Sequence, residues 1–206
     1  MNRKSEREKQ RKKGAFFMLE LKHIKKSFDG VPVLKNINLE IEDGEIVSIL
    51  GPSGCGKTTL LNIILGLTEA DAGELIFQEK DILHVPMEER GFNIVFQDYA
   101  LFPNLNVKQN ITYGLRNNKN LATVEEVNGL INLLGLKEHL DKKIEQLSGG
   151  QKRRVAMAGV LAMEPAILIL DEATAMLDPR GRKGLMRVCR ELHDRGMTVV
   201  MITHFM

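Results

Sequence analysis

Gly51-Pro-Ser-Gly-Cys-Gly-Lys57-Thr58 is the stretch that decides the fold. It fits the pattern GxxxxGK[ST], in which glycines let backbone N–H groups turn inward around phosphates and a lysine supplies a cation. An apolar, β-branched run from Ile46 to Leu50 precedes it, and a helix is predicted from Thr58 to Leu65 with its end at Gly66. A strand, this phosphate loop (residues 51–58) and a helix together predict an α/β core with a parallel sheet.

Each residue of the phosphate loop has an expected role toward a nucleoside triphosphate. The Lys57 ammonium is expected at the β and γ phosphates, and the Thr58 hydroxyl is expected to ligate Mg²⁺. The residues expected to line the phosphates are Gly51, Pro52, Ser53, Gly54, Cys55, Gly56, Lys57, Thr58 and Thr59. The motif by itself indicates a P-loop NTPase core and nothing narrower, because kinases, GTPases and many ATPases share it.

A second apolar strand ends in two carboxylates. Ile167-Leu-Ile-Leu is followed at once by Asp171 and Glu172, and two further short runs, Ile94 to Phe96 and Val199 to Thr203, also read as buried strands. A carboxylate at the carboxyl end of a parallel strand faces the ligand crevice. We therefore expect Asp171 to hold Mg²⁺ through water and Glu172 to polarise the attacking water. Taken alone, the pattern fits a strand and a solvated acidic turn equally well.

The remaining chain divides into a β region and a helical region. Apolar residues alternate with polar ones from Leu19 to Leu21 and from Ile37 to Ile41, which predicts a small antiparallel β region with a turn at Asp29-Gly30. Residues of about 98–150 carry no strong strand signal. Segments such as Val124 to Leu134 have apolar residues at helical spacing, so we expect a helical subdomain there.

Composition limits the number of domains and the class of protein. The 206 residues suffice for one well-buried core, and no uninterrupted apolar run reaches the roughly 18 residues of a membrane span. Residues 1–13 carry seven Lys/Arg and two Glu, a charge of +5, which leaves −3 of the net +2 for the remainder. We therefore expect a basic, disordered leader over residues 1–17 and one domain over residues 18–206. We expect no nucleic acid partner, since phosphate neutralisation needs a basic face.

The two cysteines, Cys55 and Cys189, have no spacing typical of a metal site or a disulfide framework. This usage fits a reducing compartment, for which the cytosol is the expectation.

Leu147-Ser148-Gly149-Gly150-Gln151 narrows the family. Two glycines ahead of a predicted helix, Gln151 to Met163, expose backbone donors at a helix N-terminus, which suits a γ-phosphate. With the preceding motifs, this signature loop (residues 147–151) resembles that of ABC-type ATPases, and the resemblance covers Leu19 to Met206. It implies a dimer with a second ATPase subunit, identical or different. Ser148 and Gly150 of one subunit would then bind the ATP held by the other.

The same resemblance implies roles for four further residues. Gln97 matches the glutamine that senses Mg²⁺ and the γ-phosphate and links to a membrane subunit. Asp178 matches a residue that communicates across the dimer beside the nucleotide, and His204 matches a switch histidine of the catalytic site. Phe28 occupies the place of the aromatic residue that stacks on adenine. Without the resemblance, Asp178 before Pro179 is equally explained as a turn residue.

Within the family the resemblance is to importers, and it divides. Asn93 to Leu115 resembles ATPases of iron, polyamine and similar importers, whereas Val155 to Met206 resembles energy-coupling-factor ATPases of vitamin or metal uptake. We expect an ATP-hydrolysing subunit that lies peripherally on the cytoplasmic face of a membrane. Its partners would be transmembrane permease subunits, and its cargo a metal ion, a vitamin or a small polar nutrient. The alternative is a soluble regulatory ATPase without a transport role.

Two further expectations follow from the importer resemblance. Tyr99, Leu101 and Phe102 are candidates to line a groove beside Gln97 that receives a helix of the membrane subunit, with a place in the subdomain core as the equal alternative. Related ATPases continue for some tens of residues past the position of His204, so we expect a domain truncated at its C-terminus.

Overall fold

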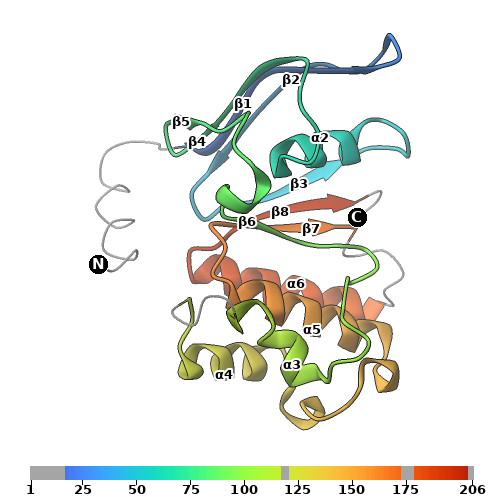
Figure 1. Cartoon of the computed structure of the whole chain (residues 1–206), viewed down its shortest axis with the longest axis vertical. Coiled ribbons are helices and arrows are strands. Elements are labelled where there is room, and N and C mark those ends of the chain that lie inside the picture. The colour runs from blue at the N-terminus through green and yellow to red at the C-terminus, as the bar shows by residue number, and fades with distance from the viewer. Residues whose placement is uncertain (1–16, 117–120, 173–178, 204–206) are drawn as a thin grey trace.

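Two four-stranded sheets organise the part of the chain that the computed structural model describes, which is residues 17–116, 121–172 and 179–203 (Figure 1). The antiparallel sheet has the order β2-β1-β4-β5, and its strands are β1 (Phe17–Phe28), β2 (Val31–Glu42), β4 (Ala72–Phe77) and β5 (Lys80–Asp81). The parallel sheet has the order β3-β8-β7-β6, and its strands are β3 (Ile46–Leu50), β6 (Phe92–Val95), β7 (Ile167–Asp171) and β8 (Thr198–Thr203). The predicted α/β class, with a parallel sheet and a separate antiparallel region, is confirmed.

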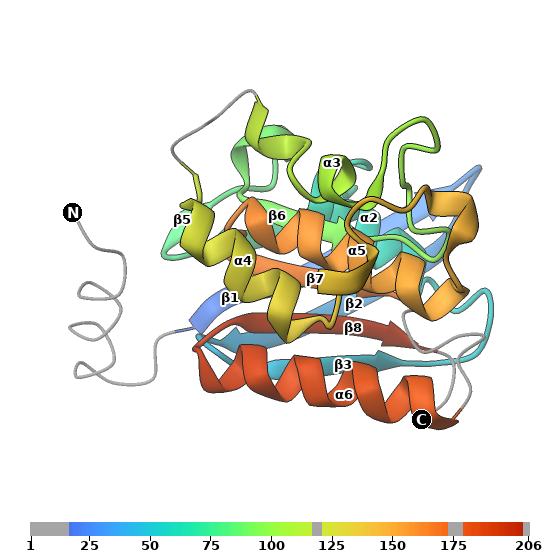
Figure 2. The same ribbon diagram turned by 90° about the horizontal axis from the view of Figure 1, so that it is seen from below.

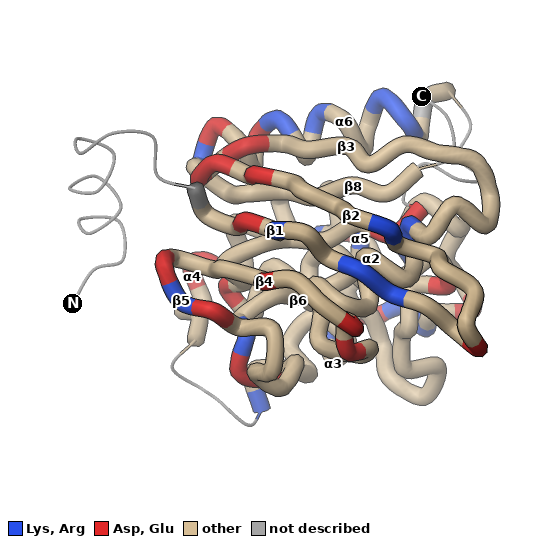
Figure 3. The backbone as a smooth tube through the Cα atoms, turned by 90° about the horizontal axis from the view of Figure 1, so that it is seen from above, with Lys and Arg blue, Asp and Glu red and all other residues tan. Residues whose placement is uncertain are grey.

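The β1–β2 hairpin follows from the alternating pattern near the N-terminus. Leu21 pairs with Leu39, and the inward residues of β1 are buried. Asp29 and Gly30 have φ values of 49° and 78°, the positive values that tight two-residue hairpin turns favour. β1 begins at Phe17, which lies inside the predicted leader, and residues 1–16 are outside the described ranges. Figure 3 shows the basic segments of β1 and β2 side by side near this turn.

The strands of the parallel sheet end level with one another. Leu50 of β3 pairs with Thr203 of β8, and Asp171 of β7 pairs with Ile202 of the same strand. β8 therefore lies between β3 and β7, and the residues that follow those two strands leave the sheet at one edge. β6 begins at Phe92, two residues before the predicted start at Ile94. It ends at Val95 and not at Phe96, because Val95 is the last residue that pairs with β7.

Helices cover both faces of the parallel sheet (Figures 1 and 2). Helix α2 (Lys57–Leu65) lies between the two sheets, and its apolar residues share one core with the inner faces of both. Helices α5 (Gly149–Ala162) and α6 (Pro179–Asp194) cover the opposite face and belong to a second core. Helix α2 ends where predicted, since Gly66 takes the left-handed φ of 82° that a helix C-cap favours.

Short helices and turns fill the segment in which a helical subdomain is expected. It holds α3 (Val107–Ile111), α4 (Val124–Leu133), the first part of α5, and 3-10 turns η3 (Gly114–Arg116), η4 (Lys137–His139) and η5 (Ile144–Gln146). A further turn, η2 (Met87–Glu89), precedes β6. Side chains of Asn106 and Thr123 cap α3 and α4. None of the helices in the described ranges is long and apolar enough to cross a lipid bilayer.

Arg90 ties helix α2 to the segment that leads into β6. Its side chain is only 4% exposed, and burial lowers the pKa of its guanidinium. The guanidinium donates to the carbonyls of Ile63 and Ile64 in the last turn of α2, at 2.7 and 2.8 Å, and to those of Leu83 and Val85, at 2.8 and 2.7 Å. A cation at the carboxyl end of a helix is favoured by the helix dipole, so Arg90 holds this end of α2 against the strand that precedes Gln97.

Candidate functional site

The phosphate loop has the backbone that its motif predicts. It connects the end of β3 to the start of α2, and Gly54 and Gly56 take φ values of 78° and 96°. A Cβ on Gly51 would lie 2.6 Å from the Cys55 Sγ, and one on Gly56 would lie 2.8 Å from Leu34 of β2. The loop therefore needs glycine at these positions, for conformation and for close packing. Ser53 and Thr58 are exposed, as a ligand-binding loop requires.

Lys57 already points across the phosphate loop. Its side chain is 7% exposed, and its Nζ donates to the carbonyl oxygens of Gly51 and Pro52 at 2.7 and 2.8 Å. Phosphate oxygens that entered the loop would compete with these carbonyls for the same ammonium. Because a phosphate carries a formal charge and a carbonyl does not, the exchange favours the phosphate.

Asp171 and Glu172 stand at the same edge of the sheet as the phosphate loop. Asp171 is the last residue of β7, and the Glu172 N–H donates to the Ile202 carbonyl of β8 at 2.9 Å. Glu172 has a φ of 46°, a left-handed conformation that costs a non-glycine residue roughly 1–2 kcal/mol. Such strain is typical of functional positions, where it persists because the surrounding structure holds it.

The oxygen donors at this edge fit Mg²⁺. The Thr58 hydroxyl lies in the first turn of α2, the Asp171 carboxylate ends β7, and the Gln97 amide follows β6. These are hard ligands, and Mg²⁺ is commonly held by one or two carboxylates together with substrate phosphates. Among the described residues no group of three or more His, Cys, Asp or Glu forms a metal cluster.

Gln97 begins a strained turn into the helical subdomain. Gln97 is exposed, and Tyr99 and Ala100 after it have φ values of 70° and 44°. Tyr99 packs against the helical core with the Arg153 guanidinium 5.1 Å from its ring centre. Of the three candidates for a docking groove, Tyr99 and Leu101 thus belong to the subdomain core.

Phe102, the third candidate, lies at the surface. It is 43% exposed, and its ring centre lies 4.1 Å from that of Tyr113, which is 41% exposed. The two rings form an exposed aromatic pair, and Phe102 lies five residues after Gln97 in the chain.

Phe28 is the last residue of β1 and precedes the turn of the β1–β2 hairpin. Its side chain is 47% exposed, and its strand partner is Val31 of β2. Further along β2, Leu34 packs close to Gly56 of the phosphate loop. The ring is therefore exposed, as stacking on a base requires.

Asp71, which precedes β4, fixes the backbone beside this ring. Its carboxylate accepts from the Lys26 Nζ at 2.8 Å and from the Ser27 N–H at 2.6 Å. These two bonds lower the pKa of Asp71 below its ordinary value. The Lys26 ammonium lies 5.4 Å from the Phe28 ring centre, within range of a cation–π contact.

The signature loop initiates helix α5 in a way that differs from the prediction. The helix begins at Gly149, so both glycines form its first turn and do not precede it. The reason is a capping box: Ser148 is the N-cap, its Oγ accepts from the Gln151 N–H at 3.3 Å, and the Gln151 Oε1 accepts from the Ser148 N–H at 2.8 Å. Ser148 is exposed and the Gly150 N–H is at an open helix N-terminus, which leaves both available to an anion.

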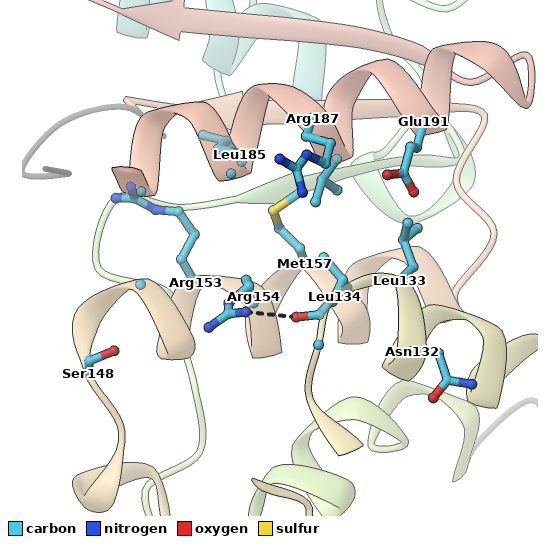
Figure 4. A pocket seen from close by; sticks show the side chains of 15 residues that line it. Asn132, Leu133, Leu134, Ser148, Arg153, Arg154, Met157, Leu185, Arg187 and Glu191 are labelled. Carbon is cyan, nitrogen blue, oxygen red and sulfur yellow. Dashed lines mark hydrogen bonds between the residues drawn. The ribbon is translucent and has the colours of Figure 1, made fainter. Parts of the chain in front are cut away.

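A cavity of about 390 Å³ opens between α5 and α6 behind the signature loop (Figure 4). Its lining includes Ser148, Gly150 and Met157 from the α5 side and Leu185 and Glu191 from α6. None of the residues that line it belongs to the phosphate loop, so the cavity lies beside the signature loop and apart from residues 51–58.

Two predicted site residues, Asp178 and His204, lie outside the described residues. Thr203, which precedes His204, ends β8 level with Leu50, the residue before the phosphate loop.

Comparison with known proteins assigns the family. A family model described as "ABC transporter" matches residues 34–175, more than half of the chain. The chain belongs to the ABC transporter family. Within it the chain is an ATP-binding domain, and the resemblance seen in its motifs is confirmed.

Two curated relatives show the same relationship. The spermidine/putrescine import ATP-binding protein PotA of Spiroplasma citri is 48% identical over 190 residues, which cover 91% of this chain and 54% of the relative. PotA of Thermotoga maritima is 47% identical over 190 residues, which cover 90% of this chain and 51% of the relative. The chain thus spans about half the length of these PotA proteins.

Two solved structures share the fold of this ABC domain. The cbiO1 protein of Clostridium perfringens, described as part of the ABC transporter complex cbiONQ, has a TM-score of 0.81 at 34% identity and matches over 92% of this chain and 79% of its own. MJ1267, described as an ATP-binding cassette of an ABC transporter in its ADP conformation, has a TM-score of 0.82 at 26% identity, over 92% and 82%.

Several residues that shape the site were missed by sequence reasoning. Arg90 and Asp71 act through partners from other elements, and so does His139, whose ring Nε2 lies 3.0 Å from the Gln151 side-chain nitrogen; no local pattern marks them. Gln151 could have been found, because serine followed three residues later by glutamine before a helix is the capping-box signal.

Proposed function

We propose that this chain is the ATP-binding and ATP-hydrolysing subunit of an ABC importer, peripheral to the membrane, with Mg²⁺ as cofactor. The observation that carries the proposal is the level ending of β3 and β7 on either side of β8. It brings the phosphate loop and the Asp171–Glu172 pair to one edge of one sheet. Lys57 and a hydrolytic carboxylate are thus available to one triphosphate.

The proposed chemistry divides between binding and water activation. Lys57 would neutralise the β and γ phosphates, and Thr58, Asp171 and Gln97 would hold Mg²⁺, which supplies charge neutralisation on the phosphates when it is bound. Glu172 would orient the attacking water and accept its proton. Glu172 directly follows β7 with a φ of 46°, and its N–H donates to the Ile202 carbonyl of β8, so its backbone is fixed at the carboxyl end of the parallel sheet, where ligands of such sheets bind.

The proposed assembly is a dimer in which each signature loop completes the site of the other subunit. Ser148 and the first turn of α5 are exposed and present donors, yet they lie on the helical subdomain. A second ATPase subunit, identical or different, would bring such a loop to the γ-phosphate. Asp178 and His204 are proposed to act at the same nucleotide, as their family positions imply.

The proposed partner is a pair of transmembrane permease subunits, which would contact the aromatic pair Phe102–Tyr113. Aromatic residues are enriched at interface centres, and Phe102 of this exposed pair lies five residues after Gln97. A movement of Phe102 on contact with a permease subunit would be transmitted to Gln97 through the four residues between them.

The proposed cargo class is the polyamines. The PotA relatives are 44–48% identical over about nine-tenths of this chain, whereas the cbiO1 structure is 34% identical. This narrows the expectation of a metal ion, vitamin or small polar nutrient to small polycationic amines.

Glu172→Gln tests the hydrolytic proposal. The variant should bind ATP like the parent, hydrolyse it about 10²- to 10⁴-fold more slowly, and accumulate as an ATP-bound dimer, because the phosphate contacts remain while water activation is lost. Light scattering after size exclusion, with ATP and with ADP, measures the dimer. Glu88→Gln, an exposed residue of η2, is the matched control. Hydrolysis by Glu172→Gln at the parent rate would contradict the role of Glu172.

Uptake assays test the cargo separately. Cells that lack this gene should lose uptake of radiolabelled spermidine and recover it with the parent chain but not with Lys57→Ala. Unchanged spermidine uptake together with loss of cobalt uptake would refute the polyamine assignment and leave the ATPase proposal intact.

A further inference from the structure

The side chain of Gln151 joins the signature serine to a histidine outside the signature loop. The Gln151 Oε1 lies 2.8 Å from the Ser148 backbone nitrogen, and the Gln151 Nε2 lies 3.0 Å from the Nε2 of His139. His139 is the last residue of the turn η4, twelve residues before Gln151, and its imidazole is half-buried.

The chemistry of the three groups fixes every proton in this chain of contacts. A backbone N–H can only donate, so the atom of Gln151 that faces Ser148 must be the carbonyl oxygen. The other end of the amide is then NH₂, which can only donate, so the Nε2 of His139 must accept with its lone pair. His139 is therefore neutral in this arrangement, with its proton on Nδ1.

The other ring nitrogen of His139, Nδ1, is buried and makes no hydrogen bond to the described residues. Within residues 17–116, 121–172 and 179–203, the one hydrogen bond that orients the imidazole is the bond it accepts from Gln151.

The geometry at Ser148 leaves its hydroxyl available. The bond that its Oγ accepts from the Gln151 N–H is long, at 3.3 Å, whereas the bond that its backbone N–H donates to the Gln151 side chain is 2.8 Å. The residue is thus fixed mainly through its backbone. Its hydroxyl can turn to an anion without release of the backbone bond.

We propose that His139 is a positioning residue for the signature serine: it accepts from Gln151, and Gln151 in turn holds the Ser148 backbone so that its hydroxyl faces the partner subunit's ATP. The inference rests on the proposed function, because it needs the signature loop to act on nucleotide. Without the acceptor on His139, the Gln151 amide is free to rotate to solvent and releases the Ser148 N–H.

The test uses the Glu172→Gln background, in which ATP-bound dimers accumulate. His139→Phe keeps the size and flatness of the ring but has no acceptor, whereas His139→Gln restores a carbonyl acceptor. His84→Phe, an exposed histidine before η2, is the matched control. Three quantities are measured on each variant: the affinity for a fluorescent ATP analogue, the ATP concentration at half-dimerisation, and the thermal midpoint.

The expected result distinguishes an effect on the signature loop, seen in dimerisation, from an effect on the phosphate loop, seen in nucleotide affinity. His139→Phe should raise the ATP concentration for half-dimerisation about three- to tenfold, as loss of one hydrogen bond predicts, with the analogue affinity of its own phosphate loop within twofold of the background. His139→Gln should return the ATP concentration for half-dimerisation to within threefold of the value of the Glu172→Gln background. In the Glu172 parent, His139→Phe should lower kcat by a similar factor.

Other outcomes overturn the inference or the function beneath it. If Glu172→Gln alone stays monomeric with ATP, the dimer proposal fails. If Glu172→Gln dimerises and His139→Phe does so at the same ATP concentration, or if His139→Gln gives no rescue, His139 does not position Ser148. If His139→Phe lowers the thermal midpoint and also weakens analogue binding as much as it weakens dimerisation, His139 has a structural role only.

Discussion

Arg90→Met is expected to destabilise the domain strongly, although Arg90 touches no predicted site residue. The substitution keeps the length of an unbranched side chain and removes four hydrogen bonds to carbonyl oxygens. The Ile63 carbonyl retains the Gly66 N–H at 3.1 Å, so three carbonyls lose the partner that Arg90 gave them.

The magnitude follows from these three carbonyls. Each buried acceptor left without a donor costs about 1–3 kcal/mol, or roughly 3–9 kcal/mol together. Relief of the buried guanidinium, whose lowered pKa reflects its desolvation, returns several kcal/mol of that sum. We therefore expect a net loss of about 3 kcal/mol in the free energy of unfolding, which is roughly 6–12 °C in the thermal midpoint for a domain of this size.

Urea unfolding followed by circular dichroism measures the loss, with Arg190→Met on the exposed side of α6 as the matched control. The control should unfold within about 0.5 kcal/mol of the parent. If Arg90→Met unfolds at the parent midpoint with an unchanged slope, the carbonyls are satisfied by water and the account of this contact is wrong.

Three further outcomes test contacts described above. Asp71→Asn should lower the thermal midpoint near pH 6, and the difference from the parent should vanish as the pH falls below about 3.8. The reason is that Lys26 and the Ser27 N–H lower the pKa of Asp71 in the folded protein. The stabilisation by the ionised carboxylate is therefore present above the ordinary pKa of 3.8 and is lost as the pH falls through the lower pKa of the folded state. A difference that grows in acid would contradict this sign. Maleimide should label the exposed Cys55 and be blocked by ATP, whereas the buried Cys189, with its pKa raised to about 11, should react only after unfolding; labelling of Cys55 that ATP does not slow would count against nucleotide in the phosphate loop. Gly66→Ala should cost about 1–3 kcal/mol by urea unfolding, because φ is 82° there and a Cβ would lie 2.8 Å from the nearest guanidinium atom; a neutral result would show that the turn adapts.

Local sequence predicted the elements that local chemistry determines. The phosphate loop, the helix after it and the end of that helix at Gly66 were predictable because glycine conformations and apolar runs act within a few residues. The register that sets Leu50 level with Thr203 was not, since it depends on pairing between segments about 150 residues apart. The start of α5 was predicted two residues late, because the serine and glutamine of the capping box were read as separate features.

The supporting residues were beyond prediction for a different reason. Arg90 finds its carbonyl partners on α2, 26 and 27 residues away, and Asp71 binds Lys26 across 45 residues. Such contacts leave no period or motif in the chain. Only the folded arrangement shows that a buried arginine caps a helix or that a histidine faces the signature glutamine.

The place of β8 in its sheet has a consequence for the order in which the protein is made. β3 pairs with β8 and with no other strand of the parallel sheet in the described ranges, so its ladder cannot form when Leu50 leaves the ribosome. At 5–20 residues per second, about 150 further residues take roughly 8–30 s to synthesise. During that interval the apolar strand β3 has no ladder partner on the nascent chain, although the helix that follows it can already pack against the antiparallel sheet. We expect a chaperone to shield this segment, and slow codons before residue 198 to lower the yield of folded protein.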